Sequence, residues 1–124
     1  MTSEEKRIFF QCLFSVAWAD GEIGAQENAL LTTLYNSVEL GVDDRAMVKA
    51  WFEAAPPEPD WRVPAGDPQM RRALVEQVFL VAMSDRVVNA AEIELLERLR
   101  DRVCMSNEEF QQLAVRVERA LSSE

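Results

Sequence analysis

The sequence predicts an all-α protein, a compact bundle of six or seven helices, and three observations lead to this prediction. Apolar side chains recur at helical spacing along most of the 124 residues, whereas no segment alternates apolar and polar residues as a half-buried strand does. Residues that commonly begin and end helices separate these segments. The composition, 48% apolar and 28% charged, is typical of a globular chain, so we expect one domain over residues 1–124.

Two helices are predicted in the N-terminal third of the chain. The first covers residues 3–19, because Thr2 and Glu5 have the spacing of a capping box, in which each side chain accepts a hydrogen bond from the other residue's backbone. Gly21 follows this helix and can adopt the left-handed backbone that closes many helices. The second helix covers residues 25–40, where leucines form a stripe.

The third helix and the segment behind it are set by an aspartate and by prolines. The helix is expected to begin behind Asp43 as its N-cap and to end near Glu53. Its buried side chains are expected to be Met47, Ala50 and Trp51. All five prolines lie in residues 54–68, which we expect to be a linker because proline removes backbone donors and restricts the residue before it. Trp61 and Val63 indicate that this linker packs against the helices.

The last three predicted helices cover residues 68–84, 90–102 and 107–121. Asp67 is the expected N-cap of the first of them, with Pro68 in the first helical position, where the missing N–H has no intrahelical acceptor. Asn89 is the expected N-cap of the second. Ser106 and Glu109 have the spacing of a capping box for the third.

The chain repeats itself with a period of 65 residues. Aligning residues 7–38 with residues 72–103 requires no gap and gives 11 identical pairs in 32 positions. We therefore expect an internal duplication, with repeat one over residues 3–53, the Pro-rich linker over 54–68, and repeat two over 69–122.

Two of the predicted helices, 3–19 and 68–84, are apolar around nearly their whole circumference. A helix without a polar face has to be surrounded, so we expect these two to form a central pair covered by the other helices. The alternative is a homodimer in which one of these faces lies at the subunit interface.

The charge and the missing histidine exclude several classes of function. The net charge is 13 − 22 = −9, which disfavours nucleic acid as a partner because phosphate binding depends on Lys and Arg. Residues 1–67 carry 5 − 12 = −7, and residues 68–124 carry 8 − 10 = −2. With no histidine, no glycine-rich phosphate loop and no recognisable nucleophile arrangement, we expect no enzyme activity.

The cysteines and the N-terminus predict a cytoplasmic protein. Cys12 and Cys104 are too few for a disulfide scaffold or a zinc site and are expected to be small core residues in a reducing compartment. The N-terminus is acidic, unlike that of a signal peptide. The apolar run over residues 8–19 is shorter than the roughly 20 residues that cross a bilayer, so no direct membrane insertion is expected.

The repeated motif lies between an apolar helix and an amphipathic one, over residues 17–27 and again over residues 82–92. Its form, A-x-x-D-G-x-I-x-x-x-E followed by a leucine pattern, resembles the tellurite-resistance TerB-like family, which includes the N-terminal domain of DjlA-type co-chaperones. This resemblance implies a soluble bacterial helical domain linked with stress responses and proposed to bind metal through acidic motif residues. In this sequence these residues are Asp20, Glu27, Asp85 and Glu92.

The motif also allows a purely structural interpretation. Asp20 could bond the backbone of its own turn, and Glu27 and Glu92 occupy the third helical position, where a carboxylate completes a capping box. Asn89 can be the other half of such a box for Glu92, whereas Gly24 has no side chain to offer Glu27, which leaves Glu27 freer to bind a cation.

The two motifs differ in how well they suit a cation. Glu22, backbone carbonyls and water could complete a shell around a divalent ion in the first motif, although Val16 and Trp18 occupy the places of EF-hand ligands and exclude that motif. In the second motif, Arg86 replaces the expected glycine and weakens the case for metal beside Asp85.

Two functions are expected from these observations. The first is a non-catalytic TerB-like stress-response domain that binds a divalent metal ion, of unspecified identity, through the acidic motif. The alternative is an adaptor that binds an unidentified protein partner through the acidic first half and holds no metal.

Overall fold

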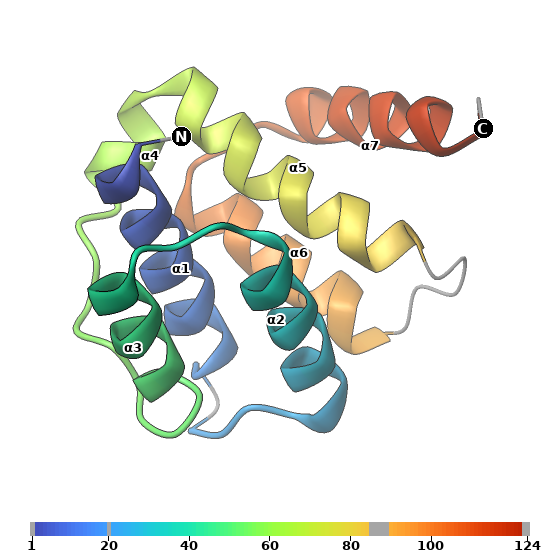
Figure 1. Ribbon diagram of the computed structural model, residues 1–124. Coiled ribbons are helices and arrows are strands. Elements are labelled where there is room, and N and C mark those ends of the chain that lie inside the picture. Colours follow the sequence, from blue (N-terminus) through green and yellow to red (C-terminus); the bar gives the residue numbers. More distant parts are fainter. Residues whose placement is uncertain (1, 20, 85–89, 123–124) are drawn as a thin grey trace. The chain divides into compact units, whose positions relative to one another are not determined.

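The computed structural model describes residues 2–19, 21–84 and 90–122 (Figure 1). These residues form seven α-helices and contain no strand, which confirms the all-α prediction. The chain separates into two compact units, residues 1–60 and 61–124, and the boundary between them falls within the Pro-rich segment. Each unit is described by itself below.

Unit 1, residues 1–60, contains α1 (Ser3–Ala17), α2 (Ala25–Ser37) and α3 (Val42–Ala50). The predicted capping box at the start of α1 is confirmed. The Glu5 N–H donates to Thr2 Oγ1 at 3.1 Å, and the Thr2 N–H donates to Glu5 Oε1 at 3.1 Å. Gly21 has a φ of 89°, the left-handed backbone expected after this helix.

The core of unit 1 forms where α1 packs on α3, which lie side by side in Figure 1. The Phe14 ring meets the Phe52 ring edge-on, with centroids 4.9 Å apart, and lies 6.3 Å from the Trp51 ring. Val48 is fully buried between the two helices' apolar faces. Other side chains of this core are Phe9, Phe10, Cys12, Leu13, Val16, Leu30, Leu31 and Leu34.

The Pro-rich segment is held against α1. Gln11 Nε2 donates a hydrogen bond of 2.8 Å to the Pro57 carbonyl, and Ser15 Oγ lies 3.5 Å from Glu58 Oε2. Pro59 is buried. Residues 57–59 therefore cover the side of α1 that carries Gln11 and Ser15, while α3 covers its neighbouring side.

Unit 2, residues 61–124, contains α4 (Arg62–Gly66), α5 (Pro68–Ser84), α6 (Ala90–Arg102) and α7 (Asn107–Ser122). Asp67 caps α5 as predicted, because its Oδ1 accepts from the Gln69 N–H at 3.1 Å and from the Met70 N–H at 3.3 Å. The α5 and α7 helices pack together, with the Phe79 and Phe110 ring centroids 5.0 Å apart.

Several predicted helix ends in unit 1 were wrong. α1 ends at Ala17 instead of residue 19, and α2 ends at Ser37 instead of residue 40, because Val38 already has extended backbone. Gly41, not Asp43, is the N-cap of α3, and Asp43 lies in the first turn, where a carboxylate favours the helix dipole.

The predicted buried face of α3 was also wrong in part. Met47 is 44% exposed and Ala50 is exposed, whereas Val48 and Trp51 are buried. The true face is thus rotated by one residue, about 100° around the helix, from the predicted one.

Two further corrections concern the segment 54–68 and Cys104. The segment is not a linker throughout, because α4 forms inside it, with Pro64 at its third position, where the absent N–H has no intrahelical acceptor. Val63 is 42% exposed, so only Trp61, half-buried beneath the Arg102 guanidinium, packs as expected.

Cys104 is exposed and is not a core residue. It has a φ of 57° and closes α6, with its N–H donating to Asp101 and the Met105 N–H donating to Arg100. These two bonds form a Schellman motif, whose left-handed position projects toward solvent.

The helices of the two units begin in the same register. α1 and α5, α2 and α6, and α3 and α7 each start 65 residues apart, and Val48 and Leu113, also 65 apart, are both buried. This agreement supports the predicted duplication. The pairing of α1 with α5 at the centre stays a prediction.

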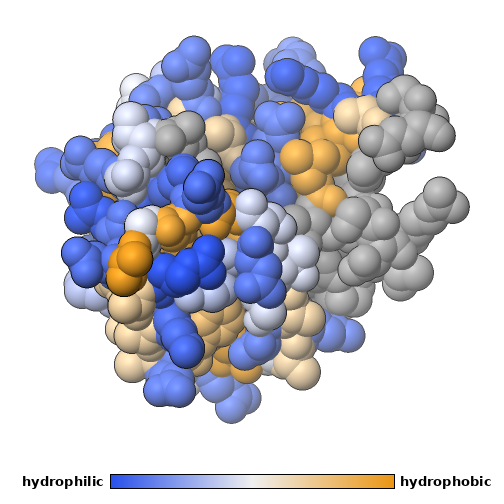
Figure 2. Space-filling model, in the orientation of Figure 1, coloured by the Kyte–Doolittle hydropathy of each residue, from blue (hydrophilic) through white to orange (hydrophobic). Residues whose placement is uncertain are grey.

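The surface visible in Figure 2 is mostly hydrophilic, with apolar groups scattered among polar ones. The large apolar residues that are exposed are Val42, Met47, Val63, Ile93 and Val115. Within the described part of the chain, no helix is both long enough and apolar enough to cross a membrane.

Candidate functional site

The first motif forms the turn between α1 and α2, and backbone hydrogen bonds define the described part of this turn. The Trp18 N–H donates to the Phe14 carbonyl at 2.9 Å, which ends α1. The Gly21 N–H donates to the Trp18 carbonyl at 2.8 Å, and the positive φ of Gly21 reverses the chain. Gly24 then serves as N-cap of α2 without a side-chain bond.

A tryptophan ties this turn to the end of α3. Trp18 Nε1 donates a hydrogen bond of 2.8 Å to the Trp51 carbonyl, and this bond is partly buried. The turn therefore sits on a fixed base, because Trp51 itself belongs to the core of unit 1.

Glu27 is the described motif residue with the most constrained carboxylate. It lies in the first turn of α2, at the third helical position, and is half-buried, with its Oε2 atom out of reach of solvent. Its Oε1 atom lies 3.4 Å from the place that a Cβ on Gly24 would occupy. The carboxylate thus folds back over the N-cap, where the partial positive charge of the helix N-terminus favours an anion.

The other four predicted ligands are placed only in part. Glu22 is described and exposed on the turn. Asp20 and Asp85 lie outside the described residues. Glu92 falls in α6, but its side chain also lies outside the described part. The structure therefore places Glu22 in the turn between α1 and α2 and Glu27 in the first turn of α2, and the approach of Asp20 to Asp85 stays a prediction.

Within the described residues, no three Cys, Asp or Glu side chains form a group that could hold a metal ion. Glu22 and Glu27 together supply at most four oxygens, whereas a hard cation such as calcium takes six to eight. A cation at this turn would therefore need Asp20, backbone carbonyls or water in addition to Glu22 and Glu27.

A second site, which the sequence did not predict, lies between α5 and α7. It is a groove of about 230 Å³ lined by Arg72, Glu109, Gln112, Leu113 and Arg116. The Glu109 carboxylate, expected to complete the capping box with Ser106, instead accepts from Arg72 Nε at 3.1 Å and from Arg71 Nη2 at 3.4 Å. Only the Ser106 half of that box is confirmed, through the Glu109 N–H to Ser106 Oγ bond of 3.1 Å.

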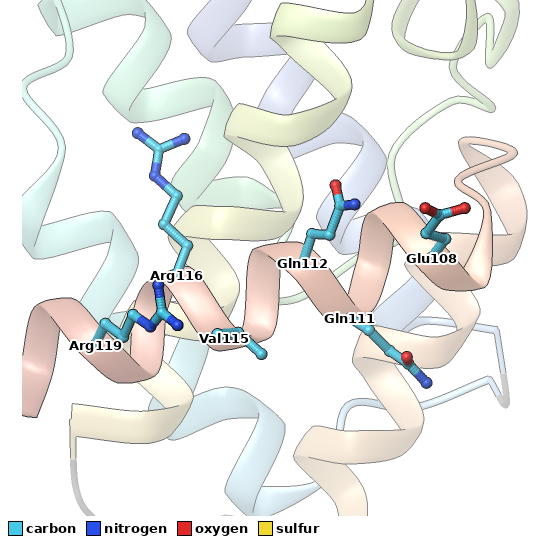
Figure 3. A pocket seen from close by; sticks show the side chains of 6 residues that line it. All are labelled: Glu108, Gln111, Gln112, Val115, Arg116 and Arg119. Atoms are coloured by element: carbon cyan, nitrogen blue, oxygen red, sulfur yellow. The ribbon is translucent and has the colours of Figure 1, made fainter.

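The groove continues onto the outer face of α7 (Figure 3). A shallow hollow of about 530 Å³ there shares Gln112 and Arg116 with the groove, and its described lining comes from α7 alone: Glu108, Gln111, Gln112, Val115, Arg116 and Arg119. In Figure 3, Arg116, Gln112 and Glu108 project from the same side of the helix. Helical spacing could have placed these α7 residues on one face, but only the fold could show Arg72 opposite them.

Cys12 is a buried thiol with no part in either site. Burial, with a smaller contribution from the negative charge of Glu58, raises the pKa of Cys12 to about 12. The thiol therefore stays protonated and is a poor nucleophile at neutral pH.

Comparison with family models, curated proteins and solved structures finds no match to this chain. The likeness to TerB-like proteins accordingly rests on the repeated acidic motif.

Proposed function

We propose that this chain is a non-catalytic TerB-like module of bacterial stress physiology that binds a divalent cation at the turn between α1 and α2. One observation carries the proposal furthest. Glu27 holds its carboxylate over the N-cap of α2, with Oε2 shielded from solvent, on a turn fixed by Gly21 and Trp18. A carboxylate held in this way loses little freedom when it binds an ion.

The proposed ligand set follows from the chemistry of hard cations. Carboxylate and carbonyl oxygens are the ligands that magnesium, calcium and manganese prefer. Glu27 and Glu22 would supply carboxylates from the described turn, and Asp20, next to Gly21 in sequence, would supply the third. The second motif is the weaker candidate, because Arg86 puts a positive charge beside Asp85 in sequence.

Isothermal titration with calcium, magnesium, manganese and zinc tests this proposal. We expect heat from at least one ion, lost in Asp20→Ala and weakened in Glu22→Gln. Glu53→Gln is the matched control, because it removes an exposed carboxylate behind α3. The proposal is overturned if none of the four ions gives a heat of binding, or if Glu53→Gln weakens binding as much as Glu22→Gln does.

A second candidate function is a protein-interaction adaptor, and the uneven charge favours it. Residues 1–60 carry 4 − 11 = −7, whereas residues 61–124 carry 9 − 11 = −2. Exposed carboxylates of unit 1 include those of Glu4, Glu22, Glu39, Asp43 and Glu53. A basic partner would therefore bind unit 1 in a salt-sensitive manner.

Capture experiments at low and high salt distinguish the adaptor from background binding. We expect a partner that is retained at low salt, released at high salt, and lost when Asp43→Asn is combined with Glu53→Gln. Glu94→Gln combined with Glu97→Gln removes the same charge from unit 2 and should retain the partner. The adaptor idea is wrong if both double variants behave alike.

A further inference from the structure

The groove between α5 and α7 has a local charge opposite to that of the whole chain. Arg72 and Arg116 line it, and Arg119 lies one helical turn beyond Arg116 on the adjoining face of α7. Glu109 inside the groove pairs with Arg71 and Arg72, and Glu108 lines the adjoining hollow at the end away from Arg119 (Figure 3). Because arginine stays protonated at all ordinary pH values, the groove presents positive charge in a chain of net charge −9.

The arginines of this groove have hydrogen-bonding capacity left for a ligand. Arg72 contacts Glu109 through Nε, and its side chain is 55% exposed. Arg116 and Arg119 are exposed and form no ion pair among the described residues. The exposed Gln112 amide, which lines the same groove, adds both a donor and an acceptor.

The floor of the groove is rigid. Arg71 and Glu109 have side chains that are only 15% and 22% exposed, and Ser106 fixes the start of α7 by capping the Glu109 N–H. Leu113 beneath the groove belongs to the core of unit 2. The positions of Arg72 and Arg116 are therefore set before any ligand arrives, which favours binding.

In unit 1 an extended segment lies along one side of α1. There, residues 57–59 lie along α1 beside α3, held by Gln11 and Ser15, and they bring Glu58 with them. The equivalent residues of α5, 65 positions later, are Glu76 and Leu80, both half-buried. In unit 2 α7 continues to Ser122, so no extended segment follows it within the described residues.

We propose that the groove between α5 and α7 binds an extended acidic peptide of a partner protein, with one carboxylate between Arg72 and Arg116 and a second against Arg119. The volume of about 230 Å³ fits a single carboxylate side chain, and the hollow beyond it accommodates the continuing peptide. Gln112 bonds the peptide backbone. This site is independent of the cation site proposed in unit 1.

Fluorescence anisotropy with a labelled oligoglutamate peptide tests the proposal at low salt. We expect binding that is weakened about fivefold by Arg116→Gln combined with Arg119→Gln, since each exposed ion pair contributes modestly. Lys49→Gln combined with Arg98→Gln is the control, because it removes the same charge outside the groove and should leave binding nearly unchanged. Glutamine is a good helix former, so all four substitutions preserve helicity, which circular dichroism checks.

Chemical-shift mapping with the same peptide locates the site. The largest shifts are expected at the Gln112 side-chain amide and along α5 and α7. An oligoglutamine peptide of equal length should cause none. The proposal is overturned by absence of binding, by equal weakening in the control variant, or by shifts confined to other helices.

Two further outcomes would assign the groove to another occupant and so also overturn the proposal. Full competition by inorganic phosphate at low concentration would indicate a small-anion site. Salt-sensitive self-association in sedimentation experiments, lost in the Arg116→Gln and Arg119→Gln variant, would indicate that a second copy of this chain fills the groove.

Discussion

Arg72 and Glu109 form in unit 2 the ion pair that Arg7 and Asp44 form 65 residues earlier in unit 1. The Arg72 Nε to Glu109 Oε1 distance is 3.1 Å, and the Arg7 Nε to Asp44 Oδ1 distance is 3.2 Å. The pair joins α1 to α3 in unit 1 and α5 to α7 in unit 2. The same arginine atom and the same register recur, which supports the duplication with tertiary contacts as well as with sequence.

The two pairs should differ in strength. Glu109→Gln is expected to lower the free energy of unfolding by about 1–2 kcal/mol, because it leaves Arg71, only 15% exposed, without its carboxylate. Asp44→Asn is expected to lower it by under about 1 kcal/mol, because Arg7 is 44% exposed. Urea denaturation of both variants measures the difference, and equal losses would contradict it.

Substitutions at Gly21 and Cys104, which both have left-handed backbone, should have opposite effects on the free energy of unfolding. Gly21→Ala is expected to destabilise by about 1 kcal/mol, because nothing lies within 4 Å of the added Cβ and the strain of φ 89° is purely conformational. Cys104→Gly is expected to stabilise by up to about 1 kcal/mol, because it relieves a φ of 57° at an exposed position. Thermal or urea unfolding measures the change in stability of each variant. The prediction is refuted if both substitutions stabilise the fold or both destabilise it.

Gly24→Ser should add the side-chain capping bond that Gly24 cannot make at the start of α2. A serine at this N-cap can accept from the Glu27 N–H, and its Cβ would meet Glu27 Oε1 at an ordinary contact distance of 3.4 Å. We expect a gain of about 0.5 kcal/mol in the free energy of unfolding. Gly24→Ala is the control, since it adds the Cβ without the hydroxyl. A gain that is as large with alanine would mean that the capping bond does not form.

Alkaline pH should weaken the fold through Cys12. The folded thiol has a pKa of about 12, whereas its ordinary value is 9.0, so between these values the folded chain keeps a proton that the unfolded chain loses. This contribution is fully present below pH 9 and declines as pH rises toward 12, by at most about 1.4 kcal/mol per pH unit. We therefore expect the native chain to lose about 1.4 kcal/mol of its free energy of unfolding between pH 7 and pH 10, a loss that Cys12→Ala does not share. Denaturation of both chains at the two pH values measures this change. A constant difference would show that Cys12 does not titrate as described.

A second recurring contact strengthens the case for duplication, and its partners are exchanged. Arg45 lies over the Tyr35 ring at 4.8 Å, and Arg100 lies over the Phe110 ring at 5.2 Å. Adding 65 to Tyr35 gives Arg100, and adding 65 to Arg45 gives Phe110. The cation and the ring thus stand at exchanged positions in the two units, and the contact joins α2 to α3 in unit 1 and α6 to α7 in unit 2. Aligning identical residues could not detect this pair.

Much of the fold could be predicted from local signals. The capping residues Thr2, Asp67 and Ser106 gave the correct starts of α1, α5 and α7, because a cap depends on residues close together in sequence. The N-cap of α3 was missed because Asp43 and Gly41 are both acceptable caps, and the local sequence does not distinguish them.

The sites were harder to predict than the helices. The motif indicated Glu22 and Glu27, which lie five residues apart on either side of the start of α2, because a helix start is a local feature of the sequence. The Arg72 and Arg116 groove depends on how α5 packs against α7, which no local pattern contains. The predicted burial of Cys12 is confirmed, whereas the predicted burial of Cys104 was wrong. Cys104 closes α6 with left-handed backbone and is exposed.

Trp51 and Arg116 occupy equivalent positions in the two units, 65 residues apart, but they differ in burial. Trp51 stands at the end of a nine-residue α3 and is buried, whereas Arg116 lies within a sixteen-residue α7 and is exposed. Unit 2 therefore leaves exposed, along the greater length of α7, a position that unit 1 fills with a buried tryptophan.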